Sequence, residues 1–192
     1  MTTLFLVRHG ETDWNRDQRW QGHSDTPLNE TGREQALELA ARLDPPDRIY
    51  SSDLARARET AEILSARLGV PVVLDGRLRE RSFGAWEGLT MDEIEERFAA
   101  DLARWRAREG AGAIDAEDFQ AFAERVGGFL DDVLARHPRE EVLVVAHGGT
   151  IRAIHALATG LDYVRDHRSI PAVDNCVPAR YAFRNGKLAP ID

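Results

Sequence analysis

The alternation of short apolar runs with helix-like segments is the feature that most constrains the fold of this chain. The apolar runs are typical of buried strands in a parallel sheet, and they occupy Thr3–Val7, Arg48–Ser51, Val70–Leu74 and Glu141–Ala146. Between and after these runs, helix-like segments occupy residues 54–68, 119–133 and 150–159. The alternation predicts an α/β fold, a three-layer α/β/α sandwich with a mostly parallel central sheet.

Local signals at helix ends and turns refine this prediction. Thr31–Glu34 and Thr90–Glu93 both match a capping box, and the first would open a helix to about Leu43. The Asn185-Gly186 pair near the C-terminus predicts the turn of a β-hairpin. We find no repeat, linker or low-complexity tract. The simplest organisation is one domain over residues 1–192, with a helical insertion at about 89–118 that contains a flexible break at Gly110–Ala113.

Composition and charge argue against several classes of protein. Hydrophobic residues make up 43% and charged residues 30%, an ordinary globular balance, and the net charge of −8 disfavours nucleic-acid binding. No run reaches the roughly 18 apolar residues of a membrane span. The first residues lack the features of a signal peptide, and Cys176, the single cysteine, cannot form an internal disulfide. We therefore expect a cytoplasmic protein without membrane or nucleic-acid partners, whose oligomeric state, a homodimer included, is left open.

Two of the predicted strands end in nearly the same way, with a histidine followed by a glycine. His9 ends the first strand, and His147 ends the strand at 141–146. Ligands of open α/β sheets collect at the carboxyl ends of the strands. If these two strands are neighbours, the two imidazoles should face each other across one pocket. Gly148 would begin the next helix, whose free N–H groups favour an anion.

Arginines add positive charge to the same strand ends. Arg8 precedes His9, and Arg56 would lie in the first turn of the helix after the second strand. The planar guanidinium group suits phosphate oxygens and stays charged at neutral pH. An arginine and histidine cluster in an acidic protein therefore predicts a phosphate-binding site.

The ordered motifs around these residues resemble those of the histidine phosphatase superfamily, also called phosphoglycerate-mutase-like. The match runs from about Leu4 to Ala158, and an ordered set of motifs is much more specific than Arg-His-Gly alone. The motifs are Arg8-His9-Gly10-Glu11-Thr12 with Asn15, then Gln21-Gly22, Pro27-Leu28, Thr31-Gly32, Ser51–Ala61, Leu78-Arg79-Glu80, Phe83–Gly88 and His147-Gly148-Gly149.

The resemblance implies a role for each matching residue. His9 would attack phosphorus and become a phosphohistidine, while Glu80 would protonate the leaving oxygen and then activate water. Binding of the phosphate or substrate would fall to Arg8, Arg56, His147, Asn15, Gln21, Gly22 and the Gly148 N–H. Fixed cations can neutralise the phosphoryl oxygens, so the resemblance implies a metal-independent phosphatase of the histidine acid type, without a cofactor. Glu87 is a second carboxylate nearby, and we interpret it as structural.

Several functions remain to be separated. The favoured one is hydrolysis of small phosphate monoesters, and the alternative is a cofactor-dependent phosphoglycerate mutase. Mutases of this family have a longer middle region with substrate-binding arginines, whereas the interval from Gly88 to Phe119 is short here. A zinc hydrolase is disfavoured because the arginines would repel a cation, and a binding module without activity would not need the full set of reactive groups. The substrate stays open among α-ribazole phosphate, phosphoglycerate-type esters and a broad set of esters.

Overall fold

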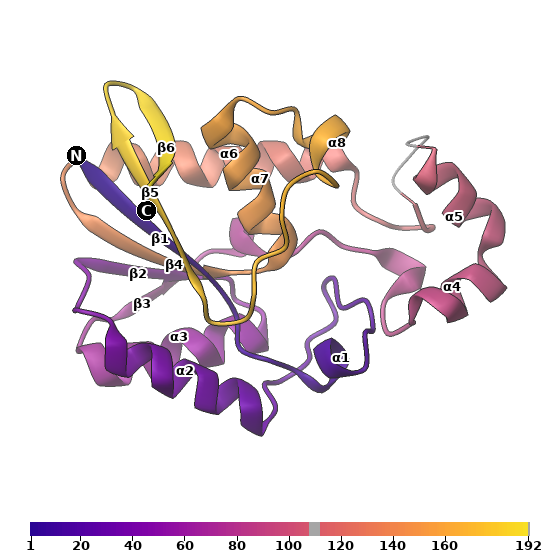
Figure 1. Cartoon of the computed structure of the whole chain (residues 1–192), viewed down its shortest axis with the longest axis horizontal. Helices are drawn as coiled ribbons and strands as arrows, with labels where there is room; N and C mark the ends of the chain where they lie inside the picture. The colour runs from indigo at the N-terminus through magenta and orange to yellow at the C-terminus, as the bar shows by residue number, and fades with distance from the viewer. Residues whose placement is uncertain (108–111, 192) are drawn as a thin grey trace.

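The computed structural model describes residues 1–107 and 112–191, and it contains a six-stranded sheet between layers of helices (Figure 1). The strands are β1 (Thr2–Arg8), β2 (Arg48–Ser51), β3 (Val72–Leu74), β4 (Glu141–Ala146), β5 (Pro178–Arg184) and β6 (Lys187–Ile191). Their order is β3-β2-β4-β1-β5-β6; the first four strands are parallel, β5 pairs antiparallel with β1, and β6 pairs antiparallel with β5. The predicted α/β class with a mostly parallel sheet is confirmed.

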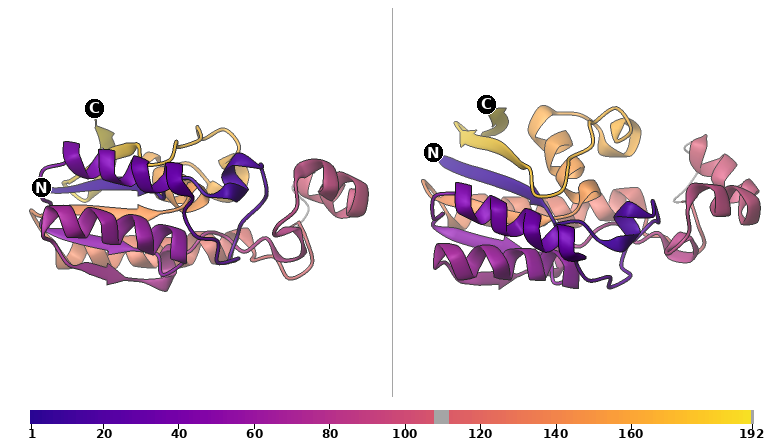
Figure 2. Two further views of the ribbon diagram at one scale, coloured as in Figure 1. Left: turned by 90° about the horizontal axis from the view of Figure 1, so that it is seen from below. Right: turned by 60° about the horizontal axis from the view of Figure 1, so that its bottom comes forward.

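Helices cover both faces of this sheet. The helices are α1 (Asp13–Arg16), α2 (Glu30–Arg42), α3 (Ala55–Leu68), α4 (Met91–Arg97), α5 (Ala99–Arg106), α6 (Phe119–Arg136), α7 (Gly148–Thr159) and α8 (Tyr163–Asp166). Two short 3-10 turns, Gly76–Leu78 and Gly84–Trp86, lie between β3 and α4. In Figure 2, α2 and α3 lie along one side of the sheet, and α4 and α5 extend away from it. None of the helices in the described ranges is long and apolar enough to cross a membrane.

The central strands are apolar at successive positions because both faces of the sheet are covered by helices. Val142 and Val144 of β4 belong to the core beneath α6 and α7, whereas Leu143 and Val145 belong to the core beneath α2 and α3. Side chains of a strand alternate between the faces of the sheet, so covering both faces requires apolar residues at every position.

The capping signals in the sequence predicted one helix start correctly and another incorrectly. At Thr90 the predicted capping box is present: the Thr90 hydroxyl accepts from the Glu93 N–H, and the Glu93 carboxylate accepts from the Thr90 N–H. The box predicted at Thr31 is wrong. Asn29 caps α2 instead, because its side-chain oxygen accepts the Gly32 N–H at 2.8 Å and the helix begins at Glu30.

The predicted insertion forms a small separate core. Trp86, Ile94, Leu102 and Ala113 are buried together, and α4 and α5 lie within the range predicted for the insertion. The break predicted at Gly110–Ala113 lies partly outside the described residues. At the far end of the chain, Asn185 and Gly186 both have positive φ and form the predicted hairpin turn. That residues 1–192 form a single domain stays a prediction.

The core beneath α6 generates a stability prediction. The Phe129 side chain is 1% exposed and packs edge-on against the Tyr50 ring, with 5.6 Å between centroids. We expect Phe129→Ala to lower the free energy of unfolding by about 3–5 kcal/mol, because it removes buried apolar surface and leaves a cavity. Urea unfolding measures this. Leu37→Ala is the control: Leu37 is 59% exposed on α2, so a change within about 0.5 kcal/mol is expected. Equal losses in both variants would contradict the assignment of the core.

Candidate active site

The two strand ends that carry the histidines lie side by side. Strands β1 and β4 pair in parallel with Arg8 opposite Ala146, and the His9 N–H donates to the Ala146 carbonyl at 3.0 Å. The imidazole rings of His9 and His147 have centroids 5.2 Å apart and planes inclined by 59°. The strands are neighbours as expected, but the rings are in contact rather than on opposite walls of a pocket. His147 is fully buried.

A hydrogen bond fixes the tautomer of His9. The His9 Nδ1 lies 2.7 Å from the carbonyl oxygen of Gly10. Because a carbonyl oxygen can only accept, Nδ1 carries the proton and Nε2 keeps its lone pair. The Asn175 amide donates to the His9 carbonyl at 2.6 Å, and the Cys176 N–H donates to the Arg8 carbonyl at 2.9 Å. The segment that precedes β5 therefore holds the backbone that carries the His9 ring.

Burial and nearby positive charge favour the neutral form of both imidazoles. Burial lowers the pKa of His9 well below its usual value, and the positive charges of Arg56 and Arg8 lower it further. The pKa of His147 is also well below its usual value, first through burial and then through Arg56 and the other positive groups around it. A neutral ring with a free Nε2 is the form of histidine that can act as a nucleophile.

Arg56 is held by backbone carbonyls instead of carboxylates. Its two terminal nitrogens donate to the carbonyl oxygens of Gly22 and Ser24, each at 2.8 Å, and the side chain is 1% exposed. Burial lowers the pKa of Arg56 to about 10, so the group remains charged at neutral pH. Gly22 has a φ of 54°, and a Cβ there would lie 2.1 Å from Glu87 Oε1. The carbonyl that positions Arg56 therefore depends on a glycine.

Two hydroxyl groups connect these elements, and sequence analysis assigned neither of them a role. Thr60 Oγ1 accepts from the Gly10 N–H at 3.0 Å and donates to the Arg56 carbonyl at 2.7 Å, which links β1 to α3. Ser52 Oγ lies 2.9 Å from His147 Nε2. Both residues fall within the Ser51–Ala61 motif, but a motif does not indicate which distant group each hydroxyl reaches.

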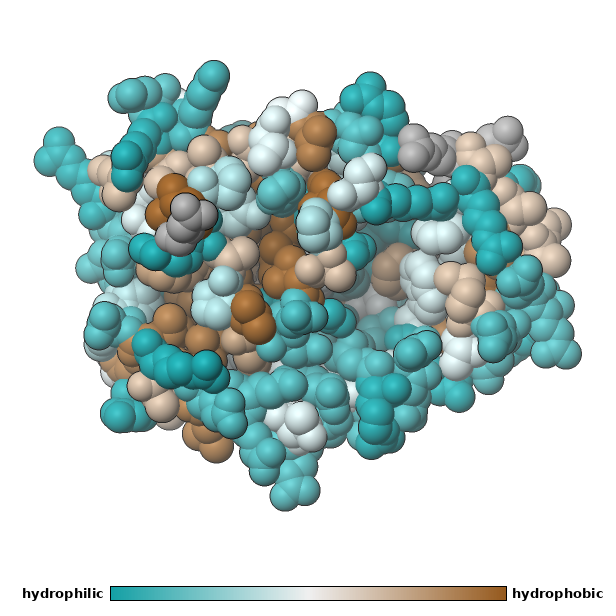
Figure 3. Space-filling view, in the orientation of Figure 1, coloured by the Kyte–Doolittle hydropathy of each residue, from teal (hydrophilic) through white to brown (hydrophobic). Residues whose placement is uncertain are grey.

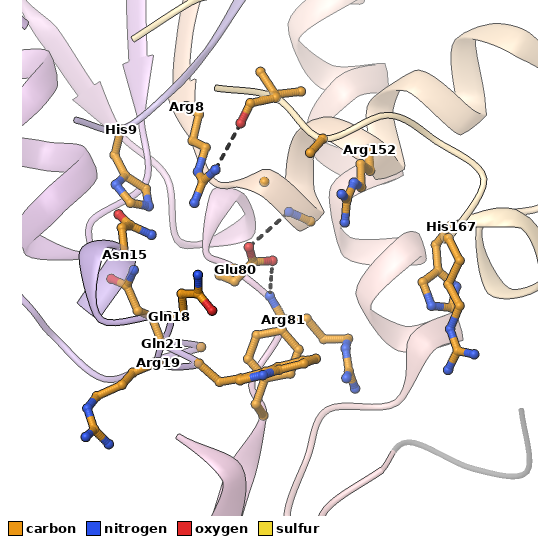
Figure 4. Close-up of a pocket in the computed structure, with 18 of the residues that line it drawn as sticks. Arg8, His9, Asn15, Gln18, Arg19, Gln21, Glu80, Arg81, Arg152 and His167 are labelled. Atoms are coloured by element: carbon orange, nitrogen blue, oxygen red, sulfur yellow. Dashed lines mark hydrogen bonds between the residues drawn. The ribbon is translucent and has the colours of Figure 1, made fainter. Parts of the chain in front are cut away.

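Glu80 lies against the first turn of α7. Its carboxylate accepts from the Gly149 N–H and from the Arg81 N–H, both at 2.9 Å (Figure 4). A Cβ at Gly149 would lie 2.1 Å from Glu80 Oε1, so the close approach requires glycine at this position. These contacts fix the Glu80 carboxyl at the edge of the cavity.

Glu87 has a structural environment, in agreement with the sequence interpretation. It accepts hydrogen bonds from the Ser24 hydroxyl and from the backbone N–H groups of His23, Ser24 and Phe83. Burial acts to raise the pKa of Glu87, but the hydrogen bonds outweigh burial and hold it below its usual value. Glu87 therefore fixes the loop whose Gly22 and Ser24 carbonyls bind Arg56.

A cavity of about 390 Å³ opens above these groups. In Figure 3 the face of the molecule is hollowed to the right of centre, with mainly hydrophilic side chains around the opening. Of the residues predicted for the site, all but one line this cavity: Arg8, His9, Asn15, Gln21, Gly22, Arg56, Glu80 and Gly148. The exception is His147, which lies beneath the cavity and in contact with the His9 ring.

Asn15 and Arg8 place donors beside His9. The Asn15 Oδ1 accepts from the N–H and the hydroxyl of Thr12, each at 3.1 Å, so its amide NH₂ is left to donate elsewhere. The Arg8 guanidinium donates to the Val173 carbonyl at 3.0 Å, and its buried Nε has no hydrogen-bond partner in the described ranges. These donors suit an anion. Within the same ranges, no group of three or more His, Cys, Asp or Glu residues could hold a metal ion.

Comparison with known protein families decides how this arrangement should be classified. The model of the histidine phosphatase superfamily (branch 1) matches residues 4–189. The chain belongs to this superfamily. The resemblance seen in its motifs is thus confirmed over nearly the whole length of the chain.

Relatives of this histidine phosphatase are named either as phosphatases or as phosphoglycerate mutases. The chain is 38% identical over 161 residues to the Uncharacterized phosphatase PhoE of Bacillus subtilis (strain 168), which covers 83% of this chain and 77% of the relative. It is 36% identical over 191 residues to the Probable phosphoglycerate mutase GpmB of Cronobacter sakazakii, covering 96% and 86%.

Solved structures with the same fold include named phosphatases. A mycobacterial glucosyl-3-phosphoglycerate phosphatase in complex with VO₃ has a TM-score of 0.87 and 34% identity, covering 98% of this chain and 96% of the other. The α-ribazole phosphatase of Shigella flexneri has a TM-score of 0.88 and 28% identity, covering 98% and 94%. This histidine phosphatase is accordingly classed as a phosphoric monoester hydrolase, with phosphoglycerate mutase as the alternative.

The lowered pKa values of the two histidines give a pH prediction. A lowered pKa keeps an imidazole neutral as the pH falls, so neither His9 nor His147 should titrate between about pH 6.5 and 8. NMR titration of the labelled imidazole rings measures this. In the urea-unfolded chain the same rings should titrate near the usual pKa of about 6.5. A folded-state pKa at or above that value for either ring would show that the site is not built as described.

Proposed function

We propose that this histidine phosphatase hydrolyses small phosphate monoesters in two steps, through a phosphohistidine on His9. The observation that carries the proposal is the state of His9: its proton is held on Nδ1 by the Gly10 carbonyl, its pKa is lowered by burial, and it lines the cavity. The remaining nitrogen, Nε2, is thereby available as a nucleophile.

In the first step, the Nε2 lone pair forms a bond to phosphorus while the bond from phosphorus to the alcohol oxygen breaks. Glu80 in its protonated form gives a proton to the departing oxygen, which leaves as the alcohol. Arg8 and Arg56 neutralise the oxygens of the phosphoryl group, and phosphoryl transfer depends mainly on such charge neutralisation and positioning. Both guanidinium groups are fixed before substrate arrives, by carbonyls of Val173, Gly22 and Ser24.

In the second step, water attacks the phosphorus of the phosphohistidine. Glu80 is now a carboxylate and accepts a proton from this water, while the bond between phosphorus and Nε2 breaks. The products are inorganic phosphate and neutral His9, and Glu80 is again protonated. The backbone hydrogen bonds from Gly149 and Arg81 keep the carboxyl in place for both proton transfers.

His147 contributes a hydrogen-bond donor to the phosphoryl group in this proposal. Ser52 Oγ accepts the Leu54 N–H at 3.3 Å and can give its own proton to His147 Nε2, which lies 2.9 Å away. The proton of the ring then sits on Nδ1, which is buried without a partner in the part of the chain that the structure describes. The Asn15 amide and the Gly148 N–H complete the phosphate site, and Gln21 and Gly22 form its outer wall.

Hydrolysis is favoured over mutase activity by the composition of the insertion. Arg104 pairs with Asp101 and Arg106 pairs with Glu95, so neither arginine is directed to the cavity. The insertion thus supplies no substrate-binding arginine from α4 or α5. The cavity volume suits a small-molecule ester. We further propose a cytoplasmic location, no metal or cofactor requirement, and no nucleic-acid or membrane partner, while a homodimer is left open.

His9→Ala tests the covalent step. We expect kcat/KM to fall by about three orders of magnitude or more, because the variant lacks the nucleophile. Release of inorganic phosphate from a panel of small esters measures this, with EDTA present throughout. The control is His155→Ala, a histidine on α7 that contacts Tyr181 and not the cavity, and it should keep most of the activity. Isomerised phosphoglycerate without phosphate release would favour the mutase, and loss of activity in EDTA would favour a metal enzyme.

Glu80→Gln tests the proton donor through the leaving group. An alkoxide needs a proton to depart, whereas a nitrophenolate departs without one. We therefore expect kcat to fall by about 10²- to 10⁴-fold for glycerol 3-phosphate and much less for the first step with p-nitrophenyl phosphate. Pre-steady-state release of nitrophenol isolates that step. A loss of equal size with both esters would assign Glu80 a role other than proton donation.

A further inference from the structure

The cavity extends well beyond the groups that would hold the transferred phosphate. In Figure 4, Arg8, His9 and Asn15 lie on one side of it, Arg152 and His167 lie on the other, and Glu80 is between them. Because Glu80 is the proposed donor to the leaving oxygen, the alcohol part of the ester must extend toward Arg152. This second side is built by α7 and by the segment that follows α8.

Arg152 differs from the other arginines on this side in having almost no partner. Arg19 pairs with Glu93 at 2.8 Å, and Arg168 donates to the Trp105 carbonyl at 2.8 Å and lies over the Trp105 ring. Arg81 donates to the Glu117 carbonyl at 2.7 Å and lies 4.1 Å from the Phe119 ring centroid. Arg152 makes a single long hydrogen bond, 3.4 Å to the Pro171 carbonyl, and no ion pair among the described residues.

The position of Arg152 separates it from the phosphate site while keeping it in electrostatic range. It lies four residues after Gly148 on α7, which is about one helical turn, or roughly 5–6 Å, along the helix. Its charge contributes to the lowered pKa of Arg8, although burial is the main cause of that shift. A guanidinium on a cavity wall that has no ion pair within the described ranges, in a chain with a net charge of −8, suits an anionic group.

His167 does not compete for that role as a second cation. Burial lowers its pKa and the charges of Arg168 and Arg81 add to this, while its ring stacks on Phe119 at 4.7 Å between centroids. The carbonyls of Tyr163 and Val164 accept from its Nδ1 at 3.1 and 3.2 Å. The ring is therefore neutral and forms part of the wall beside Arg152.

We propose that Arg152 binds a second anionic group, carried by the alcohol part of the substrate. The inference rests on the proposed function. It selects esters whose alcohol bears a carboxylate or a further phosphate over esters of neutral alcohols of the same size. Arg152 is thus a specificity-determining residue and takes no part in the transfer of phosphate.

Matched pairs of esters test this selection. 3-Phosphoglycerate and glycerol 3-phosphate differ in a carboxylate against a hydroxymethyl group, and fructose 1,6-bisphosphate and fructose 6-phosphate differ in a second phosphate. The wild type should favour the more anionic member of at least one pair by about tenfold or more in kcat/KM, the size of a charge-assisted hydrogen bond. The pair that shows the preference identifies the anionic group.

Arg152→Gln should remove that preference. We expect the ratio of kcat/KM within the pair to fall by about tenfold or more, mainly through KM, because the guanidinium charge is lost. Arg152→Lys should retain part of the ratio. Arg67→Gln removes the same charge from an exposed position on α3 and should leave the ratio unchanged.

Two outcomes would overturn the proposal: no preference in the wild type for either pair, or an undiminished ratio in Arg152→Gln. The wild-type preference needs no variant, so the test holds even if a variant folds poorly. Failure of the proposed function looks different. In that case the wild type would release no phosphate from any ester, or His9→Ala would remain active.

Discussion

The site depends above all on the parallel pairing of β1 with β4. This pairing brings together two residues that are far apart in the sequence, His9 and His147, because parallel strands end at the same edge of the sheet. The hydrogen bond from the His9 N–H to the Ala146 carbonyl extends the pairing beyond the strand itself. The start of α7 is fixed by the same edge, so its N–H groups lie where Glu80 and an anion can reach them.

Burial of positive charge gives this edge its chemistry. Arg56 is almost completely buried, and its hydrogen-bond partners are backbone carbonyls, which carry no full negative charge. The same burial and the same charge keep both imidazoles neutral. In the proposed function, a bound phosphate group would compensate this buried positive charge. The neutral imidazoles and the buried guanidinium group therefore arise from one electrostatic arrangement.

The supports of the reactive groups are largely backbone atoms, and glycines make this possible. Gly22 lets the loop approach Glu87 and present its carbonyl to Arg56, and Gly149 lets Glu80 lie directly on α7. Backbone groups have no side-chain rotamers to lose, so these supports help to order the site before substrate binds. The side of the cavity beyond Glu80 is made instead from long side chains such as Arg152, which suits recognition of the variable part of an ester.

The sequence by itself determined the fold class, the strands and the superfamily, and it named candidate site residues, all but one of which line one cavity in the structure. Apolar runs and periodic stripes are local signals, as are the Thr90 capping box and the Asn185-Gly186 turn, and these elements formed as predicted. The start of α2 was misplaced because Asn29 and Thr31 both resemble caps, and only the backbone shows which one accepts the Gly32 N–H. Periodicity and capping act over a few residues, so they can be read without a structure.

Only the tertiary structure decided which groups hold the site residues in place and how each of these residues is buried and paired. Asn175 supports the His9 carbonyl across 166 positions of sequence, and no local pattern marks it for that role. The burial of His147 beneath the cavity is likewise a result of long-range packing, as is the lack of an ion pair at Arg152 among the residues that the structure describes. Solvation and charge balance at a residue depend on every segment that folds against it, so these properties exist only once the chain is packed.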